Sequence, residues 1–415
     1  MTERQGLRLT QRVATLGTES AFDVADAARA LERVGHDIVH LEIGEPDIPT
    51  PQHIVEAGIR ALRDGATRYA PPAGLPELRD AIARSTEARG LDAAAERIVV
   101  TSGAKPMLLY ATLALVNAGD EVLVPDPGFP IYESLTRLAG GKPVPYDVDV
   151  DGSHGVTAAA VAARISPRTR VLILNAPNNP TGSDVSAAEL DALAELCLVR
   201  DIAVISDEIY SRLRFGGPHE SIATRPGMSE RTVVVNGFSK AYAMTGWRLG
   251  YGIVPAQLTE RVVRLIINST SCAPPFVQRA GIAALTGPQD AVENFVRELR
   301  QKRDAIVRGL NAINGITCRS PAAAFYAFSN LTGVLNASGL TTEEFAHHLL
   351  HSYGTATLAG TGFGARGSGH IRLSFAAPTR AIEKALERIQ HCVQDCANDG
   401  AWDGVRTPYG SGSPN

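Results

Sequence analysis

Short apolar runs alternate with longer Ala/Leu-rich stretches between residues 97 and 254, and this alternation limits the folds open to the chain. The runs are rich in β-branched residues and show little polar alternation, so each is predicted to be a strand covered on both faces. Segments such as Met107–Asn117 and Ala187–Arg200 have the spacing of amphipathic helices. The pattern predicts an α/β fold in which helices wrap a mostly parallel sheet. The runs are Arg97–Val100, Glu121–Val124, Arg170–Leu174, Ile202–Ile205, Thr232–Val235 and Leu249–Val254.

The remainder of the 415 residues predicts a second, smaller α/β domain. A long Arg-rich helix is expected from Ala291 to Gly309, between the two domains. We predict a large domain over residues 46–300 and a small domain built from 1–45 and 301–397. Residues 398–415 are rich in Gly, Pro, Ser and Asp and are predicted to form a disordered tail.

Composition argues against several classes of protein. The net charge of -4 offers no basic surface for nucleic acid. No apolar run reaches the roughly 18–20 residues that span a bilayer, and the polar N-terminus has no signal-peptide core. These absences favour the cytoplasm, with neither nucleic acid nor membrane as a partner.

The cysteines are five in number and scattered, which argues against a disulfide framework. Cys392 and Cys396 stand four residues apart on a predicted helix from Arg380 to Cys396 and could form a two-ligand metal face. The sequence shows no His/Cys cluster to complete it. Buried thiols are therefore the favoured interpretation, and no metal site is predicted.

Lys240 follows a Val-rich run and is one of only five lysines. An amine beside a buried strand can lose its charge by desolvation and attack an aldehyde. Arg248, eight residues later, could hold a phosphate in a bidentate grip. An aldehyde and a phosphate on one molecule describe pyridoxal 5'-phosphate. An isolated Ser-Lys pair would instead be interpreted as surface.

Residues at three other predicted strand ends could bind the ring nitrogen, the ring oxygen and the ring face of this cofactor. Asp207 follows a buried run and needs a cation, which a protonated pyridine nitrogen would supply; the alternative is a helix N-cap. Asn179 could donate to a phenolate oxygen, or only form a turn. Phe129 could stack on a planar ring, or fill the core.

The turn Gly103-Ala104-Lys105 lies between a predicted strand and a predicted helix. Small residues let the backbone approach an anion, and a helix N-terminus presents free N–H groups to it. An ordinary βα turn explains this segment equally well. Since ligands gather at the carboxyl ends of strands in such folds, the segments together predict one cofactor site.

These segments resemble the class I/II aminotransferase family of fold-type I pyridoxal-phosphate enzymes, and most of all its aspartate/aromatic aminotransferase branch. The resemblance covers residues 41–376. Its motifs are Leu41–Asp47, Tyr69, Gly74–Arg79, Asn178–Gly182, Asp207–Tyr210, Ser239–Lys240, Gly246–Arg248 and Ile371–Leu373.

The resemblance implies a role for individual residues. Lys240 would form the Schiff base and move the substrate proton, Asp207 would pair with the pyridinium nitrogen, and Tyr210 would bond the ring oxygen; these three are the catalytic residues. Tyr69 would reach the phosphate of a neighbouring subunit, which implies a homodimer with shared sites. The other implied cofactor-binding residues are Gly103, Ala104, Lys105, Phe129, Asn179, Ser239 and Arg248, and the implied substrate-binding residues are Gly44 and Arg372.

The predicted reaction moves an amino group from an L-amino acid to a 2-oxo acid by ping-pong chemistry. A β/γ-eliminating or γ-replacing lyase or synthase is the alternative, because it would use the same residues. A non-catalytic binding protein is disfavoured by the intact Lys240, Asp207 and Arg248, and a nicotinamide enzyme by the absence of Gly-x-Gly-x-x-Gly. Arg12 or Arg279 could receive a second substrate carboxylate, although a solvated surface arginine is the simpler interpretation of each.

Overall fold

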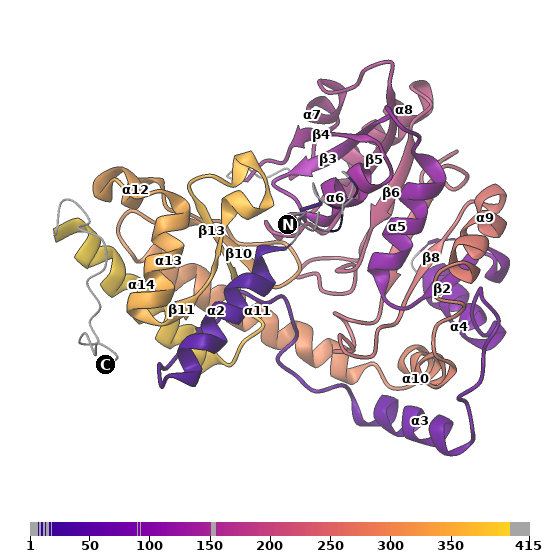
Figure 1. Ribbon diagram of the computed structural model, residues 1–415, viewed down its shortest axis with the longest axis horizontal. Helices are drawn as coiled ribbons and strands as arrows, with labels where there is room; N and C mark the ends of the chain where they lie inside the picture. Colours follow the sequence, from indigo (N-terminus) through magenta and orange to yellow (C-terminus); the bar gives the residue numbers. More distant parts are fainter. Residues whose placement is uncertain are drawn as a thin grey trace, which may run out of the picture.

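A computed structural model describes residues 19–88, 90–91, 93–150 and 155–398, together with 7, 10, 13, 16 and 17. It contains a seven-stranded sheet with helices on both faces and a four-stranded sheet beside it (Figure 1). The strands of the large sheet are β2 (Ile98–Thr101), β3 (Glu121–Asp126), β4 (Lys142–Asp147), β5 (Thr169–Asn175), β6 (Ala203–Asp207), β7 (Thr232–Gly237) and β8 (Gly250–Ile253).

The large sheet has the order β2-β8-β7-β6-β5-β3-β4. Strand β8 runs antiparallel to both of its neighbours, and all other pairs are parallel. The prediction of a mostly parallel α/β sheet is therefore confirmed. The helices that accompany this part of the chain are α3 (Gln52–Arg63), α4 (Pro76–Glu87), α5 (Ala104–Leu115), α6 (Ile131–Leu138), α7 (Ala158–Ala162), α8 (Ala187–Val199), α9 (Ala256–Ile267) and α10 (Pro275–Thr286).

The apolar runs are explained by two cores, one on each face of the sheet. Along β5, Val171 and Ile173 pack into a core shared with α5, whereas Leu172 and Leu174 pack into a core shared with α8. Because successive side chains of a strand point to opposite faces, a strand buried on both sides must be apolar throughout.

Strand β4 is the strand of the large sheet that the sequence pattern did not predict. It carries Pro143 and Pro145, its side chains are mostly exposed or half-buried, and it pairs only with β3. Proline cannot donate to a sheet ladder and is confined to edges. Strand β4 lies at the sheet edge and therefore lacks the apolar run of the inner strands.

The small sheet has the order β12-β13-β10-β9. The N-terminal part of the chain joins this region, because β1 (Val39–His40) pairs in parallel with β11 (Thr355–Ala356), and α2 (Ser20–Arg33) lies beside these elements in Figure 1. The elements are β9 (Thr317–Cys318), β10 (Tyr326–Asn330), β12 (Leu358–Ala359), β13 (His370–Ser374), α11 (Asp290–Asn311), α12 (Thr332–Ser338), α13 (Thr342–Tyr353) and α14 (Thr379–Asn398).

The predicted domain boundary at residue 300 falls inside α11. The predicted last helix is confirmed as α14, which ends at Asn398; the rest of the predicted tail lies outside the described residues. None of the helices in the described ranges is long and apolar enough to cross a membrane.

Candidate active site

A cavity of about 530 Å³ opens at the carboxyl ends of β3, β5, β6 and β7, beside the small sheet. It gathers residues from four strand ends, from the N-terminal segment and from β13. Of the predicted site residues, its walls include Gly44, Ala104, Lys105, Phe129, Asn179, Asp207, Tyr210, Ser239, Lys240, Arg248 and Arg372.

The Lys240 amine projects into this cavity and donates a hydrogen bond to the carbonyl oxygen of Gly44, at 2.5 Å. Burial, reinforced by the positive charge of Arg372, lowers the pKa of Lys240 to about 8. A substantial fraction of neutral amine is therefore present at mildly alkaline pH. This is the property expected of a lysine that attacks an aldehyde.

Asp207 is the last residue of β6, and its carboxylate accepts a hydrogen bond from the Tyr132 hydroxyl at 2.8 Å and from the Ile209 amide at 3.2 Å. Burial raises its pKa to about 6. The residues that follow form turns rather than a helix, so Asp207 is not a helix N-cap. Among the described side chains, no cation lies within ion-pair distance of this carboxylate.

Two tyrosines and an arginine form the wall toward the small sheet. The hydroxyls of Tyr210 and Tyr326 lie 2.6 Å apart, and the Arg372 guanidinium stands 4.3 Å from the Tyr326 ring centre. Arg372 donates to Asn179 Oδ1 at 2.9 Å and to the Glu42 carbonyl at 2.5 Å. Its Nε is buried without a hydrogen-bond partner, so the cation retains capacity for another acceptor.

The opposite end of the cavity is suited to an anion. Gly103 precedes α5 with a φ of 94°, and a Cβ there would lie 2.3 Å from Nη2 of Arg248. The Arg248 guanidinium donates to the Thr245 carbonyl at 2.9 Å and remains exposed. A guanidinium and the open N-terminus of α5 thus lie together, which is a favourable arrangement for a phosphate.

Lys105 differs from its predicted role as a member of the phosphate turn. Its ammonium forms an ion pair with Glu19 and lies 5.4 Å from the ring centre of Phe129 and 5.8 Å from that of Phe22. The backbone of Lys105 still belongs to the first turn of α5. Its charge, however, is engaged at the mouth of the cavity.

Two predicted residues lie elsewhere. Tyr69 is 88% exposed and lines a separate hollow with Cys272, Pro275 and Phe276. Arg279 pairs with Glu77 at the surface, and Arg12 lies outside the described residues. Arg279 therefore contributes no cation to the described cavity.

Sequence reasoning assigned no role to Tyr132, Tyr326, Glu19 or Phe22, all of which line the cavity. The role of Tyr132 could have been predicted, because Tyr132 follows closely after the end of β3, where site residues are expected. The positions of Glu19 and Phe22 in the site could not have been predicted, because the N-terminal segment reaches the site only through tertiary packing.

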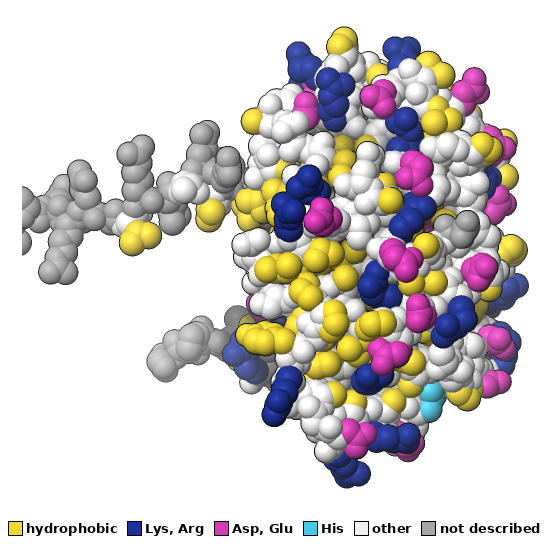
Figure 2. Space-filling view, turned by 90° about the vertical axis from the view of Figure 1, so that its right-hand side faces the viewer, with side chains coloured by type: hydrophobic (Ala, Val, Ile, Leu, Met, Phe, Trp, Pro, Cys, Tyr) yellow, Lys and Arg dark blue, Asp and Glu magenta, His cyan; other side chains and the backbone are white. Residues whose placement is uncertain are grey.

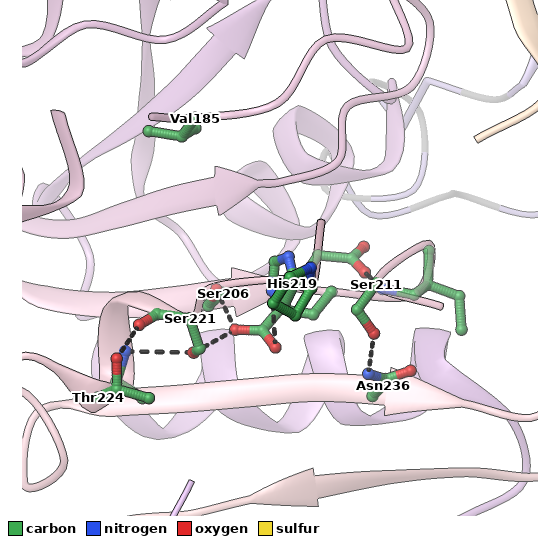
Figure 3. A network of polar contacts seen from close by, with 12 residues as sticks. Val185, Ser206, Ser211, His219, Ser221, Thr224 and Asn236 are labelled. Carbon is green, nitrogen blue, oxygen red and sulfur yellow. Dashed lines mark hydrogen bonds and ion pairs between the residues drawn. The ribbon is translucent and has the colours of Figure 1, made fainter. Parts of the chain in front are cut away.

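A buried polar network surrounds the carboxylate of Glu208, and its members Ser206, His219 and Ser221 are labelled in Figure 3. The carboxylate accepts hydrogen bonds from Ser206, at 3.0 Å, and from Ser221, and His219 Nε2 lies 3.2 Å from its other oxygen. Glu208 follows Asp207 directly, yet it is absent from the cavity wall. The network therefore fixes the end of β6 from the side opposite the cavity.

Known proteins share the sequence pattern and the fold of this chain. A model of the family "Aminotransferase class I and II" matches residues 36–389. The chain belongs to the class I and II aminotransferase family. It is 39% identical over 384 residues to an aspartate aminotransferase of Geobacillus stearothermophilus, covering 91% of this chain and 97% of that protein.

Other relatives of this aminotransferase differ in their named donors. An arginine–pyruvate transaminase of Pseudomonas aeruginosa is 37% identical over 377 residues, covering 91% of this chain and 95% of that protein. The crystal structure of an aspartate aminotransferase from Rhizobium meliloti superposes with a TM-score of 0.89 at 36% identity, covering 94% of this chain and 99% of that one. The family, the fold and the enzyme class predicted from sequence are thereby confirmed.

Proposed function

We propose that this aminotransferase binds pyridoxal 5'-phosphate in the described cavity and moves an amino group from an L-amino acid to a 2-oxo acid. The observation that carries the proposal is the convergence of three groups on one cavity. Lys240 offers an amine of lowered pKa, Asp207 a buried carboxylate with no ion-pair partner among the described residues, and Arg372 a buried cation with a donor left over.

The residues present fit this cofactor at each of its ends. Asp207 would pair with the ring nitrogen, whose positive charge would compensate the buried carboxylate. Asn179 and Tyr210 would bond the ring oxygen, and Phe129 would lie against the ring. Arg248, Ser239 and the first turn of α5, with Gly103 and Ala104, would hold the phosphate. Lys240 would hold the aldehyde carbon.

When bound, the cofactor supplies an aldehyde that accepts the amino group and a ring that stores the electron pair left on the substrate Cα. The Lys240 amine would take the proton from the substrate Cα and deliver it to the former aldehyde carbon of the cofactor, and its pKa of about 8 suits both transfers. Arg372 holds the substrate α-carboxylate, and its contacts with Asn179 and Glu42 fix its orientation. A fixed carboxylate places the Cα–H bond within reach of the amine.

The ion pair between Glu19 and Lys105 supports a donor whose side chain is not acidic. It occupies the one cation that the described cavity wall offers besides Lys240, Arg248 and Arg372, which have other tasks. Glu19→Gln should release the ammonium and raise kcat/KM for aspartate relative to alanine by about fivefold, since a partly exposed ion pair is worth about 1 kcal/mol. An unchanged ratio would show that Glu19 does not control the choice of donor.

A homodimer in the cytoplasm is the proposed working form, with two domains divided near residues 45 and 300. Exposed apolar side chains support association: Tyr69, Ile59 and Leu62 of α3, and Ile267 at the end of α9. Hydrophobic side chains also gather on the face seen in Figure 2. Mixing Tyr69→Ala and Lys240→Ala subunits would test site sharing, because only a shared site restores activity in the mixed dimer.

The absorbance of the purified holoprotein, titrated with single amino acids and no oxo acid, tests the reaction. Conversion of the cofactor from its aldehyde to its amine form, with one 2-oxo acid released per site, is the expected result. Continuous release of ammonia or of a leaving group would indicate the lyase alternative. A protein without a cofactor band would overturn the proposal.

The Lys240→Ala variant is the matched control for that titration. It should lose at least about 10³-fold in turnover, since it lacks both the attacking amine and the proton carrier. It should still retain some cofactor through the phosphate contacts. Full activity in this variant would contradict the assignment of Lys240.

A further inference from the structure

Two cysteines and a histidine meet between α13 and α14, outside the cavity of the active site. Cys392 and Cys396 are one helical turn apart on α14, and His348 comes from α13. One ligand atom from each of the three residues lies within 4.8 Å of the other two. This is the single group of three metal-ligating side chains of that compactness within the described residues. The sequence offered Cys392 and Cys396 as a pair, and the packing of the two helices supplies the third member.

The surroundings hold these groups in place. Cys392 is fully buried, His348 is 9% exposed, and Cys396 is half-buried, which leaves an approach from solvent. His348 Nδ1 lies 3.1 Å from the Ser352 hydroxyl. A hydrogen bond at one ring nitrogen orients the imidazole, as it does in metal-ligating histidines.

An acidic group stands next to the cluster. Asp395 lies between the two cysteines in sequence and accepts a hydrogen bond from the Tyr353 hydroxyl at 2.6 Å. The Tyr353 ring meets the His348 ring edge to face, with centres 5.3 Å apart. The carboxylate adds negative charge beside the ligands, and that favours a cation over an anion.

We propose that His348, Cys392 and Cys396 bind one zinc ion, with water in the fourth position. Two thiolates and an imidazole form a set that zinc prefers, and zinc takes them in a tetrahedral arrangement. Binding forms two Zn–S bonds and one Zn–N bond and releases two thiol protons to solvent, with no change of oxidation state. The ion ties the end of α14 to α13.

Cobalt titration of the reduced, metal-stripped holoenzyme tests the site, because a thiolate-to-cobalt charge-transfer band reports sulfur ligands specifically. We expect one cobalt per chain, displaced by one zinc. His348→Gln and Cys396→Ser should each weaken cobalt binding at least about 100-fold, since losing even a residue that only hydrogen-bonds to a metal ligand costs about 10–100-fold. Cobalt affinity should fall by about 100-fold for each pH unit of acidification, because two protons compete for the ligands.

Two matched variants separate this site from other metal-binding groups. Cys272→Ser removes a half-buried thiol far from α14 in sequence, and His347→Gln removes a histidine that stacks on His351 at the surface of α13. Both should keep the charge-transfer band unchanged. Absence of the band in the reduced wild-type protein, or its persistence at full affinity in Cys396→Ser, would overturn the proposal.

Discussion

Asp207 and Glu208 are consecutive buried carboxylates with opposite surroundings. Asp207 faces the active-site cavity, where two neutral donors bond it, and burial raises its pKa to about 6. Glu208 faces the protein interior, where two serine hydroxyls and His219 surround it (Figure 3). Successive residues of a strand point to opposite faces, so one β-strand end serves both regions.

This difference indicates that the Asp207 charge is available to a ligand, whereas the Glu208 charge stabilises the fold. The Glu208 carboxylate is bonded by side chains of the fold itself, Ser206 and Ser221, and we expect these contacts to contribute to stability. The Asp207 carboxylate is ionised at neutral pH at a cost that the charge of Lys240 offsets only in part, because its pKa stays raised, and a cationic ligand would relieve the rest of that cost. Buried groups left without compensation are typical of functional sites.

The sharpest test of this contrast exchanges each carboxylate for its amide. Asp207→Asn should lower kcat/KM about 10³-fold, in the range of lost electrostatic stabilisation in active sites, and raise the Tm of the cofactor-free protein. Glu208→Gln should lower Tm and leave kcat/KM within about tenfold, because a neutral amide still bonds part of the network. Steady-state kinetics and thermal unfolding of both variants check the exchange. Equal effects of the two changes on activity would break the comparison.

Removal of the Glu208 side chain should give the largest loss of stability. Glu208→Ala leaves Ser206, Ser221 and His219 buried without their shared acceptor, which costs about 3–5 kcal/mol of unfolding free energy. Chemical denaturation of the holoprotein measures it. Glu87→Ala, at an exposed position of α4, is the control and should change stability by less than about 0.5 kcal/mol.

The pH dependence of stability should reveal the two charged groups of the cavity. The folded pKa of Lys240 is lowered to about 8, so the folded state releases its proton first and stability rises from about pH 8 toward pH 10.5, by roughly 3 kcal/mol. Asp207 acts in the opposite sense: its folded pKa is raised, so stability falls as pH rises from about 4 to 6.

Cofactor-free protein is required for that measurement, because the cofactor would engage both groups. Lys240→Met should abolish the alkaline rise, and Asp207→Asn should abolish the acidic fall. An alkaline rise of the same size in Lys240→Met would assign it to another group.

The smallest expected effect belongs to Tyr132→Phe. The Tyr132 hydroxyl stabilises the ionised form of Asp207, so its loss should raise the pKa of Asp207 further and weaken cofactor binding about fivefold, as for one hydrogen bond of about 1 kcal/mol. Equilibrium dialysis of the cofactor at two pH values measures this. Binding that is equally tight at both pH values in the variant would contradict a role through Asp207.

The sequence by itself determined the frame of the site. Inner strands buried on both faces must be apolar throughout, so their positions are visible locally, and the residues just after them include Phe129, Asn179, Asp207 and Lys240. Parallel strands bring their carboxyl ends to one edge, and that rule alone predicts that these residues meet. The edge strand β4 was not predicted, because its prolines and its exposed side chains interrupt the apolar run that marks the inner strands.

Only the tertiary structure shows which residues from the rest of the chain contact the site at that sheet edge. Glu19 reaches Lys105 across 86 residues, and Arg372 reaches Asn179 across 193. His348 joins Cys392 and Cys396 because α13 packs on α14. No local pattern encodes such contacts, since each depends on how separate elements pack, and packing is a property of the whole folded chain.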